Sequence, residues 1–300
     1  MNSNLIIERE KEFIDEISDK YGYDSNIRHL LYIIIPAFII KYGTSKEKLI
    51  LDTFKNIKII STTKKDDRVK AYYSSIPKKD NDKYITSKYM VIQNYKNIEL
   101  IDLLDSLIHE FNHAVNSYIN ETNITSKYLY LRTGITYRIY DKNTLEFIKK
   151  DSSYILEEII NTKQTEDIIN IIKEFNPKNR EITNTIYAVN SLTNHKYSSD
   201  SYYLQSYICK EIINNRTFIS TLELLRINGE VYDIDKWFDN IMGKKNKYRE
   251  LNELLIKVHD LEIKLVSKKF FRNSTIESIR SLSRDIMNII EEFNSNVNFR

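Results

Sequence analysis

Two histidines and a glutamate lie close together in one short segment, which reads His109-Glu110-Phe111-Asn112-His113. Residues four apart share one face of a helix, so both imidazoles would point the same way. Two neutral imidazoles so placed can bind one Zn²⁺ at about 2.0–2.1 Å. Glu110 would lie about 100° further round the helix, where it can reach a water on the metal, and zinc lowers the pKa of that water to about 7. We therefore predict Zn²⁺ as the cofactor, His109 and His113 as metal ligands, and Glu110 as the catalytic base.

The segment around this motif has the apolar spacing of a buried helix. We predict a helix over residues 97–118, with apolar positions at Ile101, Leu104, Leu107, Ile108, Phe111, Ala114 and Val115. Polar side chains buried in such a helix need partners, because burial without them costs free energy. The alternative is that the two histidines and the glutamate lie at the surface or cap a helix. The strong apolar periodicity favours the metal site over that alternative.

The motif resembles the zinc helix of HExxH metallopeptidases, and the order of the predicted elements resembles the gluzincin group. That group has a small sheet before the zinc helix, a second helix with a glutamate ligand, and a helical second lobe. The metzincin pattern fails, because Asn116 and Ile119 replace its glycine and histidine and no further histidine occurs before His195. The resemblance implies a zinc metallopeptidase, a hydrolase that cuts peptide or protein substrates through a zinc-bound water activated by Glu110.

The resemblance also implies a third metal ligand, a glutamate on a later helix. Residues 155–166 are similar to the L-x-E segment that opens the third-ligand helix of the group. Matching Leu156 to the leucine of that segment makes Glu158 the ligand. Glu157 remains the alternative, since the two carboxylates lie about equally far from the apolar side of the helix at 100° per residue.

Neighbouring positions bear on this choice. Group members often keep a polar residue four positions after the ligand to orient a zinc-bound histidine. That residue would be Thr162 for Glu158 and Asn161 for Glu157, which mildly favours Glu157. The chain departs from the group at Ile159, because a glycine often follows the ligand there. Both glutamates could also be ordinary solvated carboxylates of a helix.

Hydrolysis of a peptide bond needs a further group that stabilises the oxyanion. A tyrosine or histidine from the second lobe usually supplies it in these enzymes. The polar stretch 194–203 offers four candidates, which are His195, Tyr197, Tyr202 and Tyr203. Residues 132–137 are predicted to form an edge strand, which could bind an extended peptide by adding it to the sheet.

The elements that would hold these residues alternate between helical and extended patterns. We predict helices over 4–20, 25–42, 45–55, 97–118 and 153–175, and strands over 57–61, 69–73 and 84–93. Residues 128–148 resemble a hairpin with a polar turn at 141–143, and the chain is mainly helical from about 183. The fold class is therefore α+β. An N-terminal α+β lobe, 1–180, would carry a small sheet and the central zinc-binding helix pair, and 181–300 would form a mainly α-helical, metallopeptidase-like C-terminal lobe.

Bulk composition excludes several classes of protein. The 300 residues include 45 Lys and Arg against 42 Asp and Glu, a net charge of +3, without the clustered basic stretches of a nucleic-acid-binding face. Cys209 is the only cysteine, which fits a reducing compartment, and residues 1–15 lack the apolar run of a signal peptide. The apolar stretch 30–40 is shorter than the roughly 20 residues of a membrane span and contains Pro36. We expect a cytoplasmic protein with no membrane span and no nucleic-acid partner.

Two other functions are compatible with the same residues. The first is a zinc-site protein that acts as a regulator or toxin on a single cellular partner. The second is a non-catalytic helical interaction protein with a vestigial metal site. A generic peptide library separates the first from a general peptidase, and an open metal position argues against the second.

Overall fold

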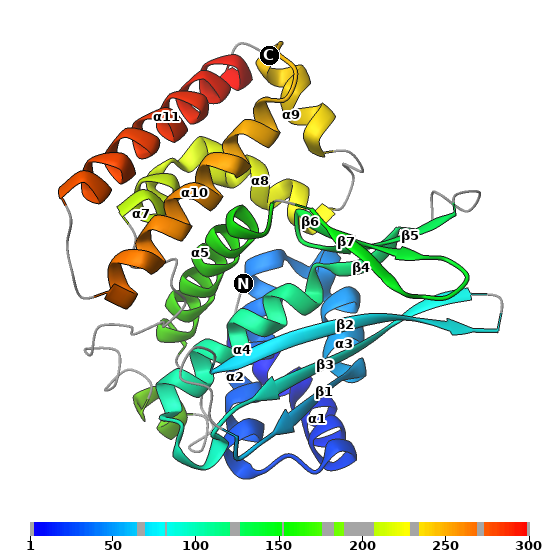
Figure 1. Ribbon diagram of the computed structural model, residues 1–300. Helices are drawn as coiled ribbons and strands as arrows, with labels where there is room; N and C mark the ends of the chain where they lie inside the picture. Colours follow the sequence, from blue (N-terminus) through cyan, green and yellow to red (C-terminus); the bar gives the residue numbers. More distant parts are fainter. Residues whose placement is uncertain are drawn as a thin grey trace. The chain divides into compact units, whose positions relative to one another are not determined.

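The computed structural model of the chain has a mixed α+β fold that is mainly helical and contains two small sheets (Figure 1). It describes residues 3–64, 70–81, 83–120, 127–151, 153–175, 183–188, 207–228, 234–268 and 273–298. The chain divides into two compact units. The first contains Met1–Ser117 and Asn161–Asp200, and the second contains Tyr118–Ile160 and Ser201–Arg300.

Three helices open the first unit, and their bounds are α1 (Ser3–Tyr21), α2 (Ser25–Tyr42) and α3 (Glu47–Asn56). Helix α2 begins after Asp24, whose side chain accepts a hydrogen bond from the Ile27 N–H, and it runs through Pro36 without a break. Every residue from Leu30 to Ile39 is buried, so this apolar stretch contributes a large part of the first unit's core. Among the described residues, no single helix is both long and apolar enough to cross a membrane. One pair of consecutive helical segments, α2 and Thr44–Asn56, is long and apolar enough when taken together, but the chain bends by 113° between them.

The first sheet consists of β1 (Ile57–Ser61), β2 (Ala71–Asp80) and β3 (Lys83–Ile92) in the order β1-β3-β2. Strand β1 runs parallel to β3, whereas β2 is antiparallel to it and forms one edge of the sheet. Strand β2 is longer than the predicted 69–73, because its polar residues near the end stay in register with β3 and are exposed, whereas β3 matches the predicted 84–93 to within one residue. Helix α4 (Leu100–Val115) packs beside β2, so the predicted zinc helix lies at this edge (Figure 1).

The second sheet is antiparallel between β5 (Tyr128–Thr133), β6 (Thr136–Asp141) and β7 (Phe147–Lys150), and β4 (Ser117–Asn120) lies beside β5. The prediction of an edge strand over 132–137 is wrong. Strands β5 and β6 occupy the middle of this sheet, and a tight turn at Gly134 joins them. Gly134 has a φ of +59°, a left-handed conformation that favours glycine, so the chain reverses here in addition to the predicted polar turn, which lies at 142–144 and joins β6 to β7.

The helices that follow are α5 (Tyr154–Lys173), α7 (Tyr207–Asn214), α8 (Arg216–Asn228), α9 (Ile234–Met242), α10 (Lys247–Lys268) and α11 (Asn273–Asn298). The core of the second unit stacks Phe238 on Phe293, with ring centroids 4.7 Å apart, and Phe218 meets Phe293 edge-on. Ile135 of the hairpin and Ile155 of α5 belong to the same buried cluster. The hairpin and the first turns of α5 therefore group with the C-terminal helices, which differs from a division of the chain at residue 180.

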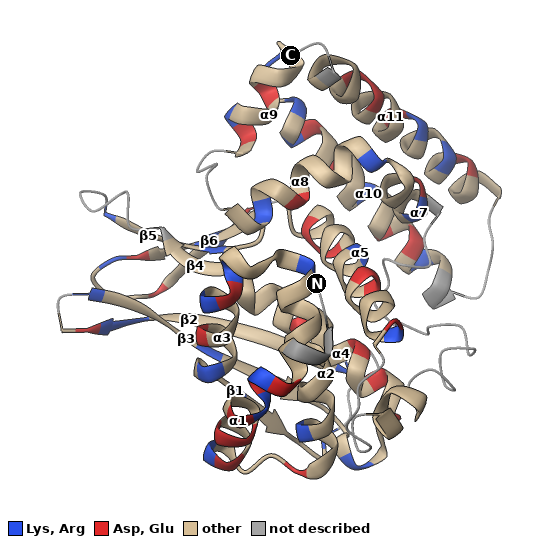
Figure 2. Cartoon of the chain, turned by 180° about the vertical axis from the view of Figure 1, so that it is seen from behind, with Lys and Arg blue, Asp and Glu red and all other residues tan. Residues whose placement is uncertain are grey.

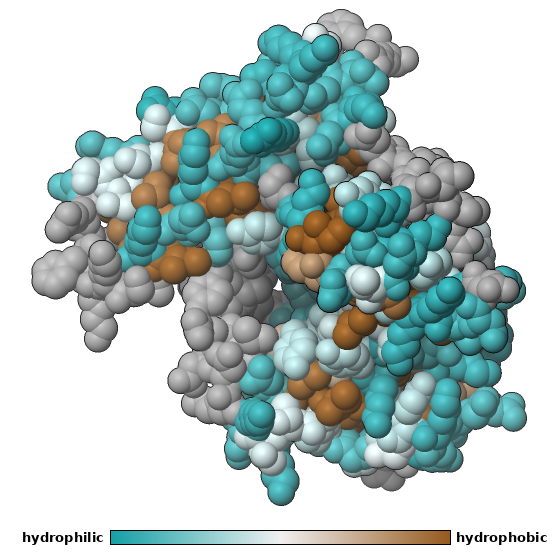
Figure 3. All heavy atoms as spheres, turned by 45° about the vertical axis from the view of Figure 1, so that its right-hand side comes forward, coloured by the Kyte–Doolittle hydropathy of each residue, from teal (hydrophilic) through white to brown (hydrophobic). Residues whose placement is uncertain are grey.

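Charged positions of both signs are interspersed along the described helices, as the cartoon in Figure 2 shows. Helix α10 is an example, where Lys247 pairs with Glu250 and Arg249 pairs with Glu253. The face seen in Figure 3 is mainly hydrophilic, and its hydrophobic side chains form separate areas. Exposed pairs of this kind contribute little to stability, about 0–1 kcal/mol each.

Glu262 on α10 gives the second unit a pH-dependent stability. Burial raises the pKa of Glu262 to about 7. The folded chain therefore keeps a proton that the unfolded chain loses above its lower pKa, and stability falls as pH rises from about 4.5 to 7. Glutamine does not titrate, so Glu262→Gln removes this loss. We expect the change in the free energy of unfolding caused by Glu262→Gln to be about 1 kcal/mol more favourable at pH 8 than at pH 4, after allowance for solvent screening.

Thermal melting of Glu262→Gln and the native chain at both pH values measures this difference. Glu253→Gln on the same helix is the matched control, because the Glu253 carboxylate is exposed and pairs with Arg249. The control should change the melting temperature little at either pH. A Glu262→Gln effect of the same size at pH 4 and pH 8 would contradict the assignment.

Candidate metal centre

Helix α4 places the three motif residues in a largely buried position. His113 is 7% exposed and Glu110 is 8% exposed, whereas His109 is partly exposed. The ring centroids of His109 and His113 are 5.0 Å apart, with the ring planes at 80° to each other. The two imidazoles therefore lie one turn apart on the same side of α4, as the four-residue spacing requires.

Hydrogen bonds of buried side chains fix α5 against α4 next to the motif. The Nδ2 atom of Asn161 donates to the backbone oxygen of His109 at 2.9 Å. The Tyr42 hydroxyl donates to Oδ1 of Asn112 at 2.7 Å and lies 3.0 Å from Oε1 of Gln164. Asn112 also donates through Nδ2 to the Thr165 hydroxyl at 3.3 Å. All of these residues belong to the first unit, so this part of α5 is held directly on the predicted zinc helix.

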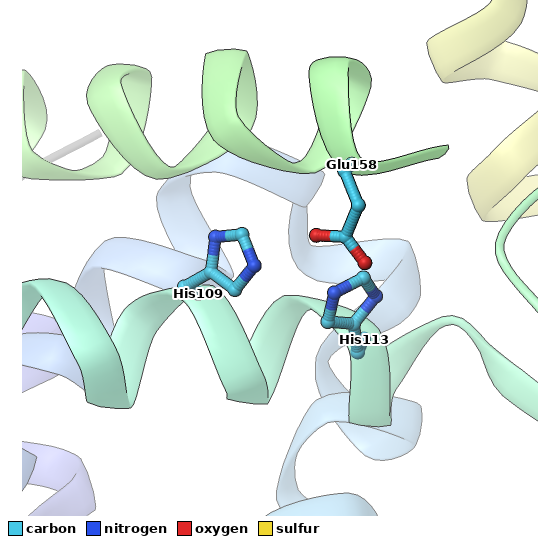
Figure 4. A group of neighbouring side chains, drawn as sticks. All are labelled: His109, His113 and Glu158. Atoms are coloured by element: carbon cyan, nitrogen blue, oxygen red, sulfur yellow. The ribbon is translucent and has the colours of Figure 1, made fainter. Parts of the chain in front are cut away.

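Helix α5 continues without a break toward its N-terminus, where Glu158 precedes Asn161 by about one turn. His109, His113 and Glu158 each offer one ligand atom, and these atoms all lie within 4.8 Å of one another (Figure 4). A tetrahedral ion with bonds of about 2.0–2.2 Å needs its ligand atoms roughly 3.4 Å apart. Small side-chain rotations would therefore close the three atoms around one ion.

The chemistry of this donor set fits zinc. Two imidazole nitrogens and one carboxylate oxygen form a known set of three protein ligands for a catalytic Zn²⁺, which leaves a fourth position for water or substrate. Magnesium and calcium prefer oxygen ligands, which fits this pair of histidines poorly. Among the described residues, the only cluster of three or more His, Cys, Asp or Glu side chains close enough to hold a metal ion is this one.

Glu157, the alternative ligand, makes a different set of contacts. Its Oε1 atom accepts hydrogen bonds from Nε and Nη2 of Arg226 at 2.9 and 2.7 Å, and its Oε2 atom accepts the Ile135 N–H at 2.9 Å. The structure thus brings Glu158 rather than Glu157 to the histidine pair. The residues one turn further on behave differently from the expectation. Asn161 donates to the backbone oxygen of His109, and the Thr162 hydroxyl has no hydrogen-bond partner among the described residues.

Glu110 is oriented by the neighbouring sheet. Its Oε2 atom accepts the backbone N–H of Tyr73 at 2.7 Å. Tyr73 lies on β2, opposite Met90 of β3, and its N–H is directed to Glu110, as alternate N–H groups of an edge strand point away from the neighbouring strand. An edge strand of the sheet therefore holds the carboxylate proposed as the base through its Oε2 atom.

Asp105 lies one turn before His109 on α4, and the sequence argument missed it. Burial raises the pKa of Asp105 to about 6, and the nearby charge of His109 acts in the opposite direction. Histidines that bind a metal commonly donate their other ring N–H to a carboxylate, so an acidic residue at this spacing is a candidate partner. The signal was present in the sequence as the four-residue spacing between Asp105 and His109. The expected oxyanion candidates His195, Tyr197, Tyr202 and Tyr203 lie outside the described residues.

Comparison of the chain with models of known protein families, with curated proteins and with solved structures finds no match in any of the three.

Asn112 should be important for stability because it joins two helices at the motif. Its side chain is fully buried and bonds both Tyr42 and Thr165. Asn112→Ala would leave these groups without their partner, at an expected cost of about 1–3 kcal/mol in the free energy of unfolding. Denaturant unfolding measures that cost. The control is Asn56→Ala on α3, whose exposed amide donates to the Asp52 carbonyl, and a loss no larger than in the control would contradict the assigned role.

Proposed function

We propose that the chain is a zinc-dependent metallopeptidase, a hydrolase that cuts peptide bonds in peptide or protein substrates. The observation that supports it most is the convergence of His109, His113 and Glu158, from two helices, to within 4.8 Å of one another. These three residues would hold Zn²⁺ and leave one position open. When bound, the ion would polarise the substrate carbonyl and lower the pKa of the attacking water.

Glu110 is the general base of the proposed reaction. It accepts a proton from the attacking water and later donates it to the nitrogen of the leaving amine, so that the carboxylate is regenerated. The N–H of Tyr73 holds one carboxylate oxygen at 2.7 Å, which fixes the direction of the other.

The β2 edge offers a binding mode for an extended peptide beside Glu110. An edge strand presents backbone donors and acceptors that can add another strand to the sheet. The N–H of Tyr73 on this edge is bonded to Glu110, so a peptide that paired with other backbone groups of β2 would run close to the base. We also propose a cytoplasmic location, which the single cysteine of the chain supports.

A digest of a broad peptide library by the zinc-loaded chain tests the activity. We expect cleavage products in the mass spectrum, their loss on addition of a chelator, and their return when zinc is restored. Silence of a chain that binds zinc would contradict a general peptidase. It would favour an enzyme that acts on a single partner, or a helical interaction protein with a vestigial metal site.

A further inference from the structure

A buried ion pair lies one residue away from the proposed third ligand. Arg226 of α8 is 0% exposed and Glu157 of α5 is 2% exposed. The guanidinium donates through Nε and Nη2 to one carboxylate oxygen, and the Ile135 N–H donates to the other. Both oxygens of Glu157 are therefore bonded, and the side chain is held in one orientation.

The turn between β5 and β6 is shaped to receive this carboxylate. A Cβ atom at Gly134 would lie 2.0 Å from Oε2 of Glu157, so only glycine lets the backbone approach so closely. Arg132 fastens the turn, because its Nε donates to the Gly134 oxygen at 2.5 Å and its Nη2 donates to the Leu225 oxygen at 3.2 Å. The hairpin turn, α5 and α8 thus meet at the carboxylate of Glu157.

Stability alone does not account for this arrangement. A buried ion pair often contributes no more to stability than apolar side chains of the same volume, because removing two charges from water is costly. The forked geometry of the guanidinium does supply direction. An apolar pair would let the first turn of α5 rotate slightly, whereas the hydrogen bonds to Glu157 define its orientation.

We infer that Glu157, Arg226 and Gly134 are positioning residues that set the rotation of the first turn of α5, so that Glu158 faces His109 and His113. Successive residues of a helix point about 100° apart, so fixing Glu157 also fixes the direction of Glu158. The ion pair has a second effect, because it keeps the neighbouring carboxylate from competing for the metal. This inference rests on the proposed metal site.

The double variant Glu157→Gln with Arg226→Met tests the inference. It removes both charges and nearly keeps both volumes, and the glutamine can still accept the Ile135 N–H. We expect zinc affinity, measured by competition with a chelator, to fall about 10–100-fold, as for other residues that orient metal ligands. The absorption spectrum of the Co²⁺-loaded chain should also change, because it reports the geometry of the ligands.

Leu222→Ala is the matched control, since Leu222 is fully buried on α8 one turn before Arg226. It should lower the melting temperature and leave the zinc affinity and the Co²⁺ spectrum unchanged. A folded double variant with native zinc affinity and a native Co²⁺ spectrum would overturn the inference. If the double variant does not fold, Gly134→Ala decides, because it pushes on the Glu157 carboxylate without removing a charge and should weaken zinc binding in the same way. Lack of zinc binding by the native chain is a different result, which would overturn the proposed function itself.

Discussion

Glu110→Gln is expected to keep zinc bound at native affinity and to lose peptide hydrolysis by about 10²–10⁴-fold. A glutamine has nearly the same shape, and its oxygen can still accept the Tyr73 N–H that now holds Glu110. It cannot take a proton from water, and general base catalysis contributes a factor of this size. Because Glu110 is not a metal ligand in the proposed site, the metal should be unaffected.

Steady-state rates on a peptide cut by the native chain, together with the zinc content of both proteins, measure this effect. Glu99→Gln provides the control, since Glu99 directly precedes α4 and is exposed. The control should retain both zinc and activity. Native rates in the zinc-loaded Glu110→Gln variant would remove Glu110 from its role as the base.

Glu158→Gln is expected to weaken zinc binding by roughly 100-fold or more, a larger effect than that of residues which only orient the ligands. The substitution removes the anionic ligand atom that lies within 4.8 Å of the histidine nitrogens. Zinc should also raise the melting temperature of the native chain, because it binds the folded state, and this rise should shrink in the variant.

Chelator competition and thermal melting with and without zinc measure the loss. Glu174→Gln is the matched control, because Glu174 directly follows the same helix and is exposed. It should bind zinc as the native chain does. Native affinity in Glu158→Gln would show that another group completes the site.

The sequence was sufficient to predict local helical geometry. Spacing alone places His109 and His113 on one face of a helix, because residues four positions apart are neighbours on the helix surface. The long apolar patterns of α1, α2, α4 and α5 also predicted their positions to within a few residues. Helix α2 passes through Pro36 intact and has the bounds of the predicted helix over 25–42.

Long-range contacts were beyond such reasoning. Helical periodicity could not separate Glu157 from Glu158, because that choice depends on Arg226, which is 69 residues away in the chain. The contact between Tyr73 and Glu110 likewise depends on which strand lies at the edge of the first sheet. The polar turn predicted at 141–143 is present between β6 and β7, whereas the turn at Gly134 was not predicted, although its glycine was a local signal.

The zinc content of the purified chain tests the central claim most directly. The measurement is mass spectrometry of the metals retained after dialysis against a weak chelator. We predict about one zinc per chain, held by His109, His113 and Glu158. A chain with all three ligands intact that retains no zinc, and takes none up when zinc is supplied, would contradict the account.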